Sequence, residues 1–429
     1  MKIGMVSLGC AKNRVDSENL LGRLRDAGHE FVDDPAQADA IFVNTCGFIE
    51  AAKQESIDAI LEMAQARKPG AKLIVTGCLA QRYSDALMEQ IPEIDALIGV
   101  ADYNRALEML DGKGRAMAVE GKERFPRCGR VLTTAPYTAY VKISDGCDNR
   151  CTYCAIPLIR GGYESRPYED VVAECRSLAR QGVTEICLIA QDTSRYGNDI
   201  YGKTRMAELL RDVAAIEGVH WVRVLYCYPD TTDDELLETI AGEEKVCEYL
   251  DLPLQHINDR LLRAMNRRGS SDWIKSRIKK CRDMGITVRT TMIVGFPGET
   301  DEEFRELMDF VRETRFDRLG AFAYSAEEDT PAAEMDGQIP ENVKIERLDQ
   351  IMMLQQAISQ ELNEARIGEE CEVLCEGFEE GAYYGRSRRE APESDGVIRF
   401  IADREIQPGE YVQVRITGAE AYDLYGEVI

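Results

Sequence analysis

Cys147-Asp148-Asn149-Arg150-Cys151-Thr152-Tyr153-Cys154 places three cysteines at the spacing C-x3-C-x2-C. No regular helix or strand presents three sulfurs so spaced to one point, so we expect a loop wrapped around a compact inorganic centre. Three thiolates suit a four-iron, four-sulfur cluster (4Fe-4S) whose fourth iron has no protein ligand and can bind a cofactor. Zinc is the alternative, but zinc usually takes four closed ligands. No histidine lies nearby in sequence, since the chain has only His29, His220 and His256.

The segment that contains this loop predicts a barrel. Strand-like runs alternate with amphipathic segments, and six β-α units in series are typical of a barrel or partial barrel whose active site lies at the carboxyl ends of the strands. The cysteine loop follows the first of these strands, where such a site would lie. The expected strands are 137–143, 185–190, 220–225, 249–254, 287–294 and 320–324; the expected helices are 169–181, 205–216, 233–241, 259–265, 272–284 and 301–314, with a closing helix at 343–366.

A second set of three cysteines lies in the first 120 residues. Cys10, Cys46 and Cys78 each come directly after a short apolar run, and amphipathic segments separate the runs. This alternation predicts a parallel sheet covered by helices, with ligands at the carboxyl ends of its strands. The three thiols could therefore meet at one edge and form a second metal site; three separately buried cysteines are the alternative. The expected strands are 2–8, 40–44, 72–76 and 94–99, and the expected helices are 15–27, 49–65 and 79–90.

The segments before and after the barrel segment differ from it in composition and pattern. Residues 119–136 contain Gly, Pro and Arg and are interpreted as a linker. From residue 368 onward, short alternating runs are broken by Gly, Pro and Asp, which predicts a small antiparallel β-barrel. Its expected strands are 372–374, 383–388, 397–401, 411–416 and 422–428.

Composition indicates a globular protein of the cytoplasm. The chain of 429 residues has 44% apolar and 30% charged residues. Nothing near the N-terminus resembles a signal peptide, and no window approaches the roughly 18 apolar residues needed to span a bilayer. Fourteen cysteines in that compartment are better metal ligands, reactive thiols or core residues than disulfide partners. The net charge of −25 argues against a generic nucleic-acid binder and fits a basic macromolecular partner, or simply a solvated acidic surface.

The compact cysteine motif resembles that of the radical S-adenosylmethionine (SAM) enzymes. The resemblance implies that Cys147, Cys151 and Cys154 hold a 4Fe-4S cluster with exchangeable SAM, and that the protein binds, orients and excludes water while the cofactor supplies the reactivity. Further SAM contacts that it suggests are Tyr153 beside the last cysteine, Gly295 within residues 291–299, and Arg166 within residues 160–166. Gln191 and Gln255, at predicted strand ends, are candidates for SAM contact or for structural capping.

The order of the three segments narrows the family to the methylthiotransferases, which the chain resembles over nearly its whole length. The implied domains are an N-terminal α/β domain (1–120), a radical SAM barrel (133–366) and a TRAM-like β-barrel (368–429). The resemblance implies a second 4Fe-4S cluster on Cys10, Cys46 and Cys78 that carries the sulfur to be transferred. It also implies an electron donor such as flavodoxin or ferredoxin. The cluster ligands apart, the sequence singles out no catalytic residue.

Three segments resemble the branch that modifies an aspartate of small-subunit ribosomal protein twelve, rather than the branch that modifies tRNA adenosine. Ala11-Lys12 stands where tRNA enzymes typically carry Gln and a second residue, residues 225–229 lack the Ser-x-His-Pro pattern of that branch, and residues 385–396 resemble the TRAM segment of the protein-modifying branch. Residues 368–429 contain 6 Arg, no Lys and 15 Asp or Glu, a net charge of −9 that suits a basic protein better than tRNA phosphates. Arg386, Arg388 and Arg389 could contact ribosomal RNA. A tRNA methylthiotransferase and a non-catalytic iron–sulfur or zinc protein remain the alternatives.

The remaining cysteines are expected to be packing residues. Cys371 and Cys375 have C-x3-C spacing, but four residues along a strand place both on one face, which suggests a core position. The other six are Cys128, Cys175, Cys187, Cys227, Cys247 and Cys281.

Overall fold

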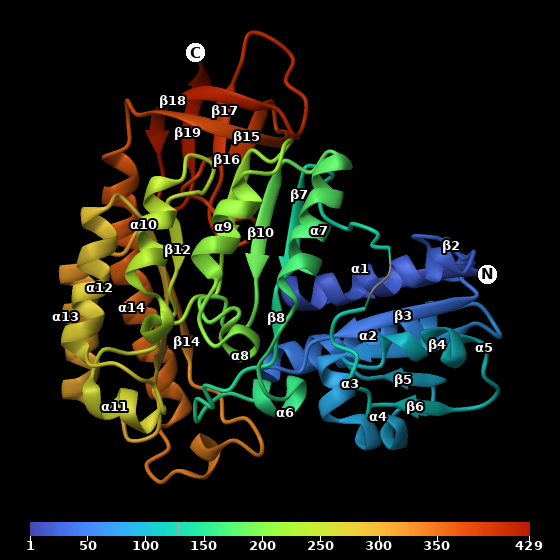
Figure 1. Ribbon diagram of the computed structural model, residues 1–429. Helices are drawn as coiled ribbons and strands as arrows, with labels where there is room; N and C mark the ends of the chain where they lie inside the picture. The colour runs from blue at the N-terminus through green and yellow to red at the C-terminus, as the bar shows by residue number, and fades with distance from the viewer. Residues whose placement is uncertain (127–128) are drawn as a thin grey trace.

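The computed structural model describes residues 1–126 and 129–429. Figure 1 shows three parts: a helix-covered parallel sheet near the N-terminus, an open β/α barrel, and a small β-barrel seated on one end of the large one. The N-terminal sheet lies beside the other end of the large barrel. The predicted α/β class and the three-part architecture are confirmed.

The N-terminal sheet contains six parallel strands in the order β2-β1-β3-β4-β5-β6. Helices α1 and α5 pack on one face, and α2, α3 and α4 pack on the other. Burial on both faces explains why β3 and β4 are continuous apolar runs. The elements are β1 Lys2–Ser7, α1 Ala11–Asp26, β2 Glu30–Phe31, β3 Ala40–Thr45, α2 Glu50–Ala66, β4 Lys72–Gly77, α3 Cys78–Arg82, α4 Ser84–Gln90, β5 Ala96–Ile98, α5 Ala106–Asp111 and β6 Ala116–Ala118.

Two expectations for this sheet need correction. The helix expected at 79–90 is divided at Tyr83, whose backbone is not helical, into α3 and α4. The edge strands β2 and β6 were not expected, because two or three residues are too few to show a period in the sequence.

The large barrel consists of two three-stranded parallel sheets, β7-β10-β11 and β12-β13-β14. A single parallel bridge between Val222 and Val246 joins them near β11 and β12. Helix α1 of the N-terminal part packs against β7. The strands are β7 Thr138–Lys142, β10 Glu185–Ile189, β11 Trp221–Val224, β12 Tyr249–Asp251, β13 Thr287–Val294 and β14 Arg318–Ala323, with a two-stranded ribbon of β8 Ser144–Asp145 and β9 Glu164–Ser165. The helices are α6 Ile156–Arg160, α7 Tyr168–Arg180, α8 Asn198–Tyr201, α9 Met206–Ala214, α10 Asp234–Gly242, α11 Asp259–Ala264, α12 Ser271–Asp283, α13 Asp301–Thr314 and α14 Glu341–Glu364.

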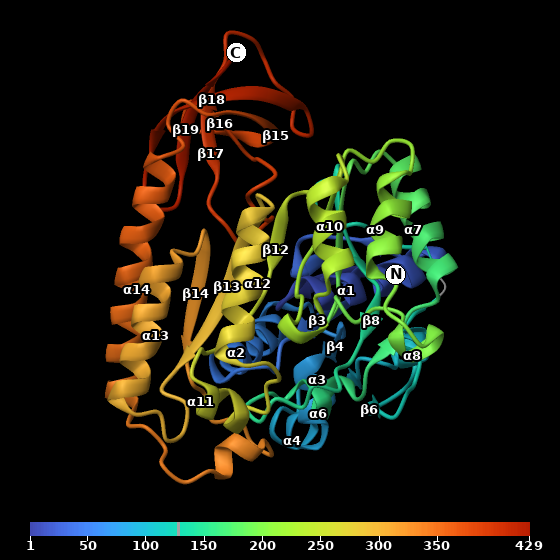
Figure 2. The ribbon, with the colours of Figure 1, turned by 60° about the vertical axis from the view of Figure 1, so that its left-hand side comes forward.

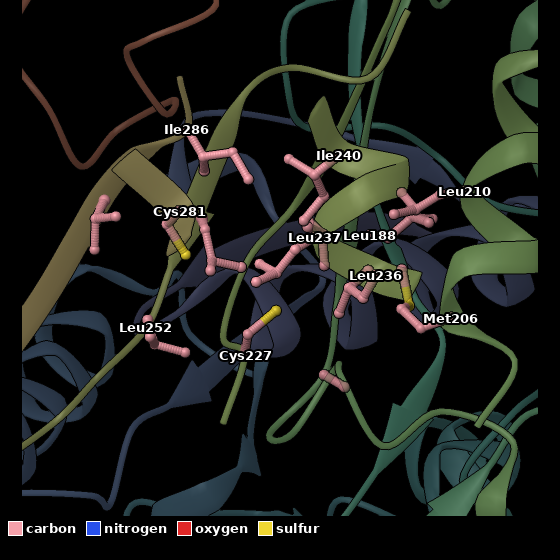
Figure 3. Close-up of a cluster of buried hydrophobic side chains, with 14 of the residues drawn as sticks. Leu188, Met206, Leu210, Cys227, Leu236, Leu237, Ile240, Leu252, Cys281 and Ile286 are labelled. Carbon is pink, nitrogen blue, oxygen red and sulfur yellow. The ribbon is translucent and has the colours of Figure 1, made fainter. Parts of the chain in front are cut away.

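The main core lies between these strands and the helices outside them. Figure 3 shows part of it, where Leu236, Leu237 and Ile240 of α10 meet side chains from the strands and from α12. Cys227 and Cys281 lie among these aliphatic side chains. All five described cysteines of the barrel that were expected to be packing residues are buried: Cys175, Cys187, Cys227, Cys247 and Cys281. Cys128 lies outside the described residues.

The C-terminal part is a closed five-stranded barrel in the order β15-β16-β17-β19-β18. Four of its pairings are antiparallel, as expected, and the exception is the parallel pairing of β17 with β19. Cys375 is buried in its core and Cys371 packs against that core, as their spacing predicted. The strands are β15 Glu370–Glu379, β16 Ala382–Arg386, β17 Ile398–Ile401, β18 Tyr411–Ala419 and β19 Leu424–Val428.

Arginines of the segment 385–396 attach the small barrel to the large one. Arg386 is 1% exposed and forms an ion pair of 2.7 Å with Glu185, at the start of β10. Arg388 pairs with Glu248 at 2.8 Å. The expectation that Arg386 contacts RNA is therefore wrong, because its charge is already neutralised inside the protein; Arg389 is about half exposed.

None of the described helices is long and apolar enough to cross a lipid bilayer.

Candidate functional site

The compact cysteine loop lies at the carboxyl end of β7, after the short strand β8. Its backbone is fixed at both ends: the Cys147 N–H donates to the Gly161 carbonyl at 3.2 Å, and the Thr152 N–H donates to the Met265 carbonyl at 3.1 Å. The amide of Asn266 donates to the carbonyls of Asn149 and Arg150, both at 3.0 Å. Residues that follow α11 therefore hold the loop in place.

The three thiols of this loop lie close enough to affect one another. Burial raises the pKa of the Cys147 thiol to about 12, and the neighbouring Cys151 adds to the rise. Burial also raises the pKa of Cys154, again with contributions from Cys151 and Cys147. Three thiolates at this place need positive charge to compensate them, as the irons of a cluster would provide.

A cation that the sequence did not single out lies beside this loop. Buried Arg267 places Nη1 3.9 Å from Cys151 Sγ and 3.4 Å from Tyr153 Oη. Its guanidinium stacks on the Tyr228 ring at 4.1 Å, and the Tyr228 hydroxyl lies 3.2 Å from Cys151 Sγ. In the sequence, Arg267 is one of several arginines around a helix end, and no local pattern marks it.

The dispersed cysteines meet at one edge of the N-terminal sheet. Strands β1, β3 and β4 are neighbours in register, with Ser7 opposite Asn44 and Asn44 opposite Thr76. Their following residues include Cys10, which caps the N-terminus of α1, Cys46 after β3, and Cys78, which begins α3. The predicted convergence of the three strand ends is thus present in the structure.

Close backbone packing draws these three loops together. Gly9 has φ +90°, and a Cβ there would lie 3.1 Å from the Cβ of Cys46, so a side chain would crowd that cysteine. The amide of Asn13, in the first turn of α1, donates to the carbonyls of Leu8 at 2.8 Å and Thr45 at 3.0 Å. Asn13 therefore ties the end of β3 to the loop that carries Cys10.

The pKa values of these thiols are shifted in different directions. Burial raises the pKa of Cys78 to about 11, although Arg160 opposes the rise. Burial would also raise the pKa of Cys10, but the charges of Lys12 and Arg160 and two backbone N–H groups outweigh it and lower that pKa. Cys10 itself is exposed, at the end of the loop that precedes α1.

The two cysteine sets face each other across the boundary between the N-terminal sheet and the barrel. Cys78 packs in one apolar cluster with Val100, Ala155 and Ile159. Ala155 directly follows Cys154, and Ile159 belongs to α6. Figure 2 shows α3, which begins with Cys78, next to α6 below the barrel strands.

A buried network of four charges spans the same boundary. Arg160 of α6 donates to Asp16 of α1 at 2.9 Å and to Asp145 at 3.1 Å, and its Nη2 lies 3.5 Å from Cys78 Sγ. Lys142 pairs with the same two aspartates. Two positive and two negative charges, all at most 4% exposed, therefore neutralise one another between the two cysteine sets.

A cavity of about 220 Å³ lies at the barrel mouth between these two sets. From the N-terminal part it is lined by Phe48 and Ile49, which follow Cys46 closely in the chain; from the barrel, Tyr153 precedes Cys154. The other lining residues are Gln255, Thr291, Ile293, Phe322, Ala323, Tyr324, Ser325 and Glu327.

The five residues expected to contact SAM occupy different environments. Tyr153 and Gln255 line the cavity, and the Oε1 atom of Gln255 is buried without a hydrogen-bond partner. Gln191 donates to Asp145 at 3.1 Å and also has a buried Oε1 without a partner. Gly295 ends β13 with φ +72° and donates its N–H to Glu299. Arg166 is engaged by Glu174 on α7 and lines a different depression, with Arg130 and Asp170.

Among residues 1–126 and 129–429, no three His, Cys, Asp or Glu side chains come close enough to surround one metal ion. Zinc would require such ligands at about 2.0–2.3 Å from a shared centre. A four-iron cluster is larger and accepts thiolates that stand farther apart.

Comparison with known proteins gives the same three-part division. Residues 2–99 match the model of the uncharacterized protein family UPF0004, residues 141–311 match the radical SAM superfamily, and residues 367–429 match the TRAM domain. The chain is 49% identical to the ribosomal protein uS12 methylthiotransferase RimO of Clostridium botulinum strain Hall, with 100% of this chain and 98% of the relative covered.

This chain belongs to the RimO family. A RimO of Desulforamulus reducens is likewise 49% identical, over 99% of each chain. Among solved structures, the radical SAM methyltransferase TsrM of Kitasatospora setae, with cobalamin and a [4Fe-4S] cluster bound, has a TM-score of 0.57 at 17% identity, covering 77% of this chain and 76% of that one. At this level of identity, the likeness shows a shared fold only.

Proposed function

We propose that this protein is a radical SAM methylthiotransferase that acts on ribosomal protein uS12 and uses SAM and two 4Fe-4S clusters. When bound, one cluster and SAM together supply a radical able to take hydrogen from an unactivated C–H bond, and the other supplies sulfur. The observation that carries this proposal is the packing of Cys78 against Ala155 and Ile159, which places the second cysteine set beside the first.

In this proposal Cys147, Cys151 and Cys154 hold the cluster that binds SAM. The donors fit, because the three thiols belong to one loop held rigidly by backbone hydrogen bonds. Buried Arg267 supplies a fixed positive charge and a weak hydrogen bond at Cys151 Sγ, and the Tyr228 hydroxyl lies beside the same sulfur. Charges and hydrogen bonds at a ligand sulfur tune the affinity and reduction potential of a cluster.

Cys10, Cys46 and Cys78 hold the sulfur-carrying cluster. Cys10 is the N-cap of α1, and the N-terminal dipole of that helix favours a thiolate there. Arg160 donates to Cys78 Sγ from the barrel side. Cys10 is the exposed thiol of the three, and Cys78 is the buried one.

The cavity between the two sets is the place proposed for SAM. It is mostly apolar, as suits an adenine ring, and Tyr153 and Ile293 line it. The unpartnered Oε1 atoms of Gln255 and Gln191 are acceptors that lack donors in the protein alone. The amino and hydroxyl groups of SAM are suitable donors, and buried acceptors are normally paired. Gly295 is proposed to border the adenine, whereas the engagement of Arg166 by Glu174 makes an indirect role in positioning β9 the better assignment.

The substrate atom proposed is the β-carbon of an aspartyl residue of uS12. The acidic charge of this chain, −25 overall, favours a basic ribosomal protein over tRNA. Arg389, which is about half exposed and pairs with Glu369 at 3.4 Å, is the arginine of the segment 385–396 that we propose for contact with ribosomal RNA. Flavodoxin or ferredoxin is proposed as electron donor, and the cytoplasm as the location.

The proposed division of labour follows the three domains. Residues 1–120 carry the sulfur-bearing cluster, residues 133–366 bind SAM, and residues 368–429 recognise the ribosomal substrate. The acidic module is attached to the amino ends of the barrel strands by Arg386 and Arg388, away from the cysteine loop.

The substrate proposal is tested by mass measurement of uS12 and of total tRNA from cells with and without this gene. Loss of one methylthio group from uS12 in the deletion strain, with tRNA unchanged, is expected. A change in tRNA with uS12 unaltered would favour a tRNA methylthiotransferase, and no change in either would favour a non-catalytic protein.

A further inference from the structure

Lys12 is a buried cation for which the described residues provide no carboxylate. It lies in the first turn of α1, two positions after Cys10, and is 7% exposed. No Asp or Glu side chain of the described chain lies within ion-pair distance of its Nζ, in contrast to Lys142 and Arg160 nearby. Buried charges are normally paired, so the site lacks an anion.

The Lys12 ammonium points to the barrel and not to the thiol beside it. Its Nζ lies 3.0 Å from the centre of the Tyr226 ring, a close cation–π contact. It makes no hydrogen bond to Cys10 Sγ, unlike Arg267 at Cys151. The side chain thus extends from the N-terminal domain toward the carboxyl end of β11, where barrel enzymes bind their substrates.

Tyr226 is held rigidly at this place. Its φ of +64° is rare for a bulky residue and signals a local constraint. Its N–H donates to Asp251 Oδ2 at 3.0 Å, and its carbonyl accepts from the Thr193 N–H at 3.0 Å. The Lys12 charge also reaches Asp251, where it opposes the rise that burial causes in the pKa of that carboxyl. The ion pair of Asp251 is with Arg289, at 3.3 Å, so Lys12 has no direct carboxylate partner among the described residues.

Lys12 and Tyr226 come from two of the segments in which this chain differs from the tRNA-modifying branch. The contact brings Ala11-Lys12 together with residues 225–229 at the barrel mouth. An aspartyl substrate carries a carboxylate one bond from the carbon to be modified, whereas an adenosine base carries none. A buried cation at this place can pair with the side chain of the first substrate and finds no charge on the adenine base of the second.

We propose that Lys12 is a specificity-determining residue that binds the side-chain carboxylate of the target aspartate of uS12. This inference rests on the proposed function. With the carboxylate on Lys12, the adjacent β-carbon is held near Cys10, which lies two positions before Lys12 in the chain. The face of the Tyr226 ring contacts the ammonium and orients it.

The test compares uS12 with a uS12 variant in which the target Asp is replaced by Asn, using reconstituted, unreduced enzyme so that no turnover occurs. A hydrogen bond between charged groups contributes more to binding than one between neutral groups. The wild type should therefore bind the Asp form roughly ten- to hundredfold more tightly than the Asn form. Lys12→Gln should bring that ratio close to one, and Lys12→Arg should keep most of it. The ratio of kcat/KM values for the two substrates in reduced enzyme should follow the same order.

Lys68→Met is the matched control, since Lys68 is a half-exposed lysine of the same domain paired with Asp39; its ratio should equal that of the wild type. An unchanged Asp-to-Asn ratio in Lys12→Gln, with iron and sulfide content intact, would overturn the assignment of Lys12. If Lys12→Gln loses iron, the Asp-to-Asn affinity ratio is measured with Lys12→Arg instead. A ratio near one in that variant overturns the assignment as well. Failure of the wild type to modify either form of uS12 would instead contradict the proposed function.

Discussion

Arg160 places its Nη2 atom 3.5 Å from the Sγ atom of Cys78, although the two residues belong to different domains. Arg160 ends α6, the helix that follows the compact cysteine loop, and Cys78 begins α3 of the N-terminal sheet. The same guanidinium is bonded to Asp16 and Asp145. One side chain therefore fixes the distance between the two proposed cluster sites.

Arg160→Met should destabilise the protein strongly. Removing one partner of a buried ion network leaves Asp16 and Asp145 with unbalanced charge, at a cost of about 3–5 kcal/mol. Urea unfolding of the unreconstituted protein measures this directly. Arg105→Met is the control, because Arg105 forms an exposed pair with Glu108 and its loss should cost less than about 1 kcal/mol. Equal effects of the two substitutions would contradict the role given to Arg160.

Single substitutions in the two cysteine sets should affect different activities. Cys151→Ala should abolish conversion of SAM to 5′-deoxyadenosine, because the SAM-binding cluster loses a ligand. Cys46→Ala should retain SAM cleavage and lose sulfur insertion into uS12. Cys227→Ala, at a buried cysteine of the barrel core, should retain both activities. SAM cleavage that persists in Cys151→Ala would remove the compact loop from its proposed role.

Gln255→Leu should weaken SAM binding without loss of iron. The substitution removes the unpartnered Oε1 of a residue that lines the cavity and leaves the apolar lining in place. One lost hydrogen bond should raise the dissociation constant of SAM roughly tenfold, measured by equilibrium binding to the oxidised enzyme. Gln54→Leu, on an exposed turn of α2, provides the control. Unchanged affinity in Gln255→Leu would place SAM elsewhere.

Glu390 should give the protein a pH-dependent part of its stability. Burial opposes its ionisation, but Arg366 at 2.7 Å and Arg318 at 3.0 Å outweigh burial and lower the pKa of Glu390 to about 2 from 4.5. Because the folded pKa lies below the unfolded one, the stabilisation is complete above about pH 4.5 and is lost as the pH falls toward 2.

Glu390→Gln should therefore be less stable than the wild type by about 3 kcal/mol at pH 7, and by clearly less at pH 3. Urea unfolding at the two pH values provides the measurement. Glu370→Gln, which removes an exposed pair with Arg415, should show little difference at either pH. A Glu390→Gln deficit of the same size at both pH values would rule out this ionisation as its cause.

Much of the fold could be predicted because local signals agree with the tertiary structure. Strand β13 and helix α13 have the predicted bounds, since Thr300 and Glu303 form a capping box that marks the helix start in the sequence. The convergence of Cys10, Cys46 and Cys78 followed from the regular strand–helix alternation. In contrast, the parallel pairing of β17 with β19 depends on how a barrel closes, which no local pattern encodes.

The parts of the site that could not be predicted depend on contacts between distant segments. Arg160 lies 82 positions from Cys78 in the chain and Arg267 lies 116 from Cys151, so neither spacing carries a local signal. Arg386 stands between Gly385 and Ser387, and nothing in this local sequence indicates that it is buried. Its burial against Glu185 becomes visible only once the small barrel is placed on the large one.

Iron and sulfide analysis of anaerobically reconstituted protein tests most directly whether the six cysteines hold two clusters. The wild type should contain about eight irons and eight sulfides per chain. A triple alanine variant at Cys10, Cys46 and Cys78, and another at Cys147, Cys151 and Cys154, should each retain about half. One or two zinc ions per wild-type chain without sulfide, or a wild-type iron content that one triple variant removes completely, would contradict the two-cluster account.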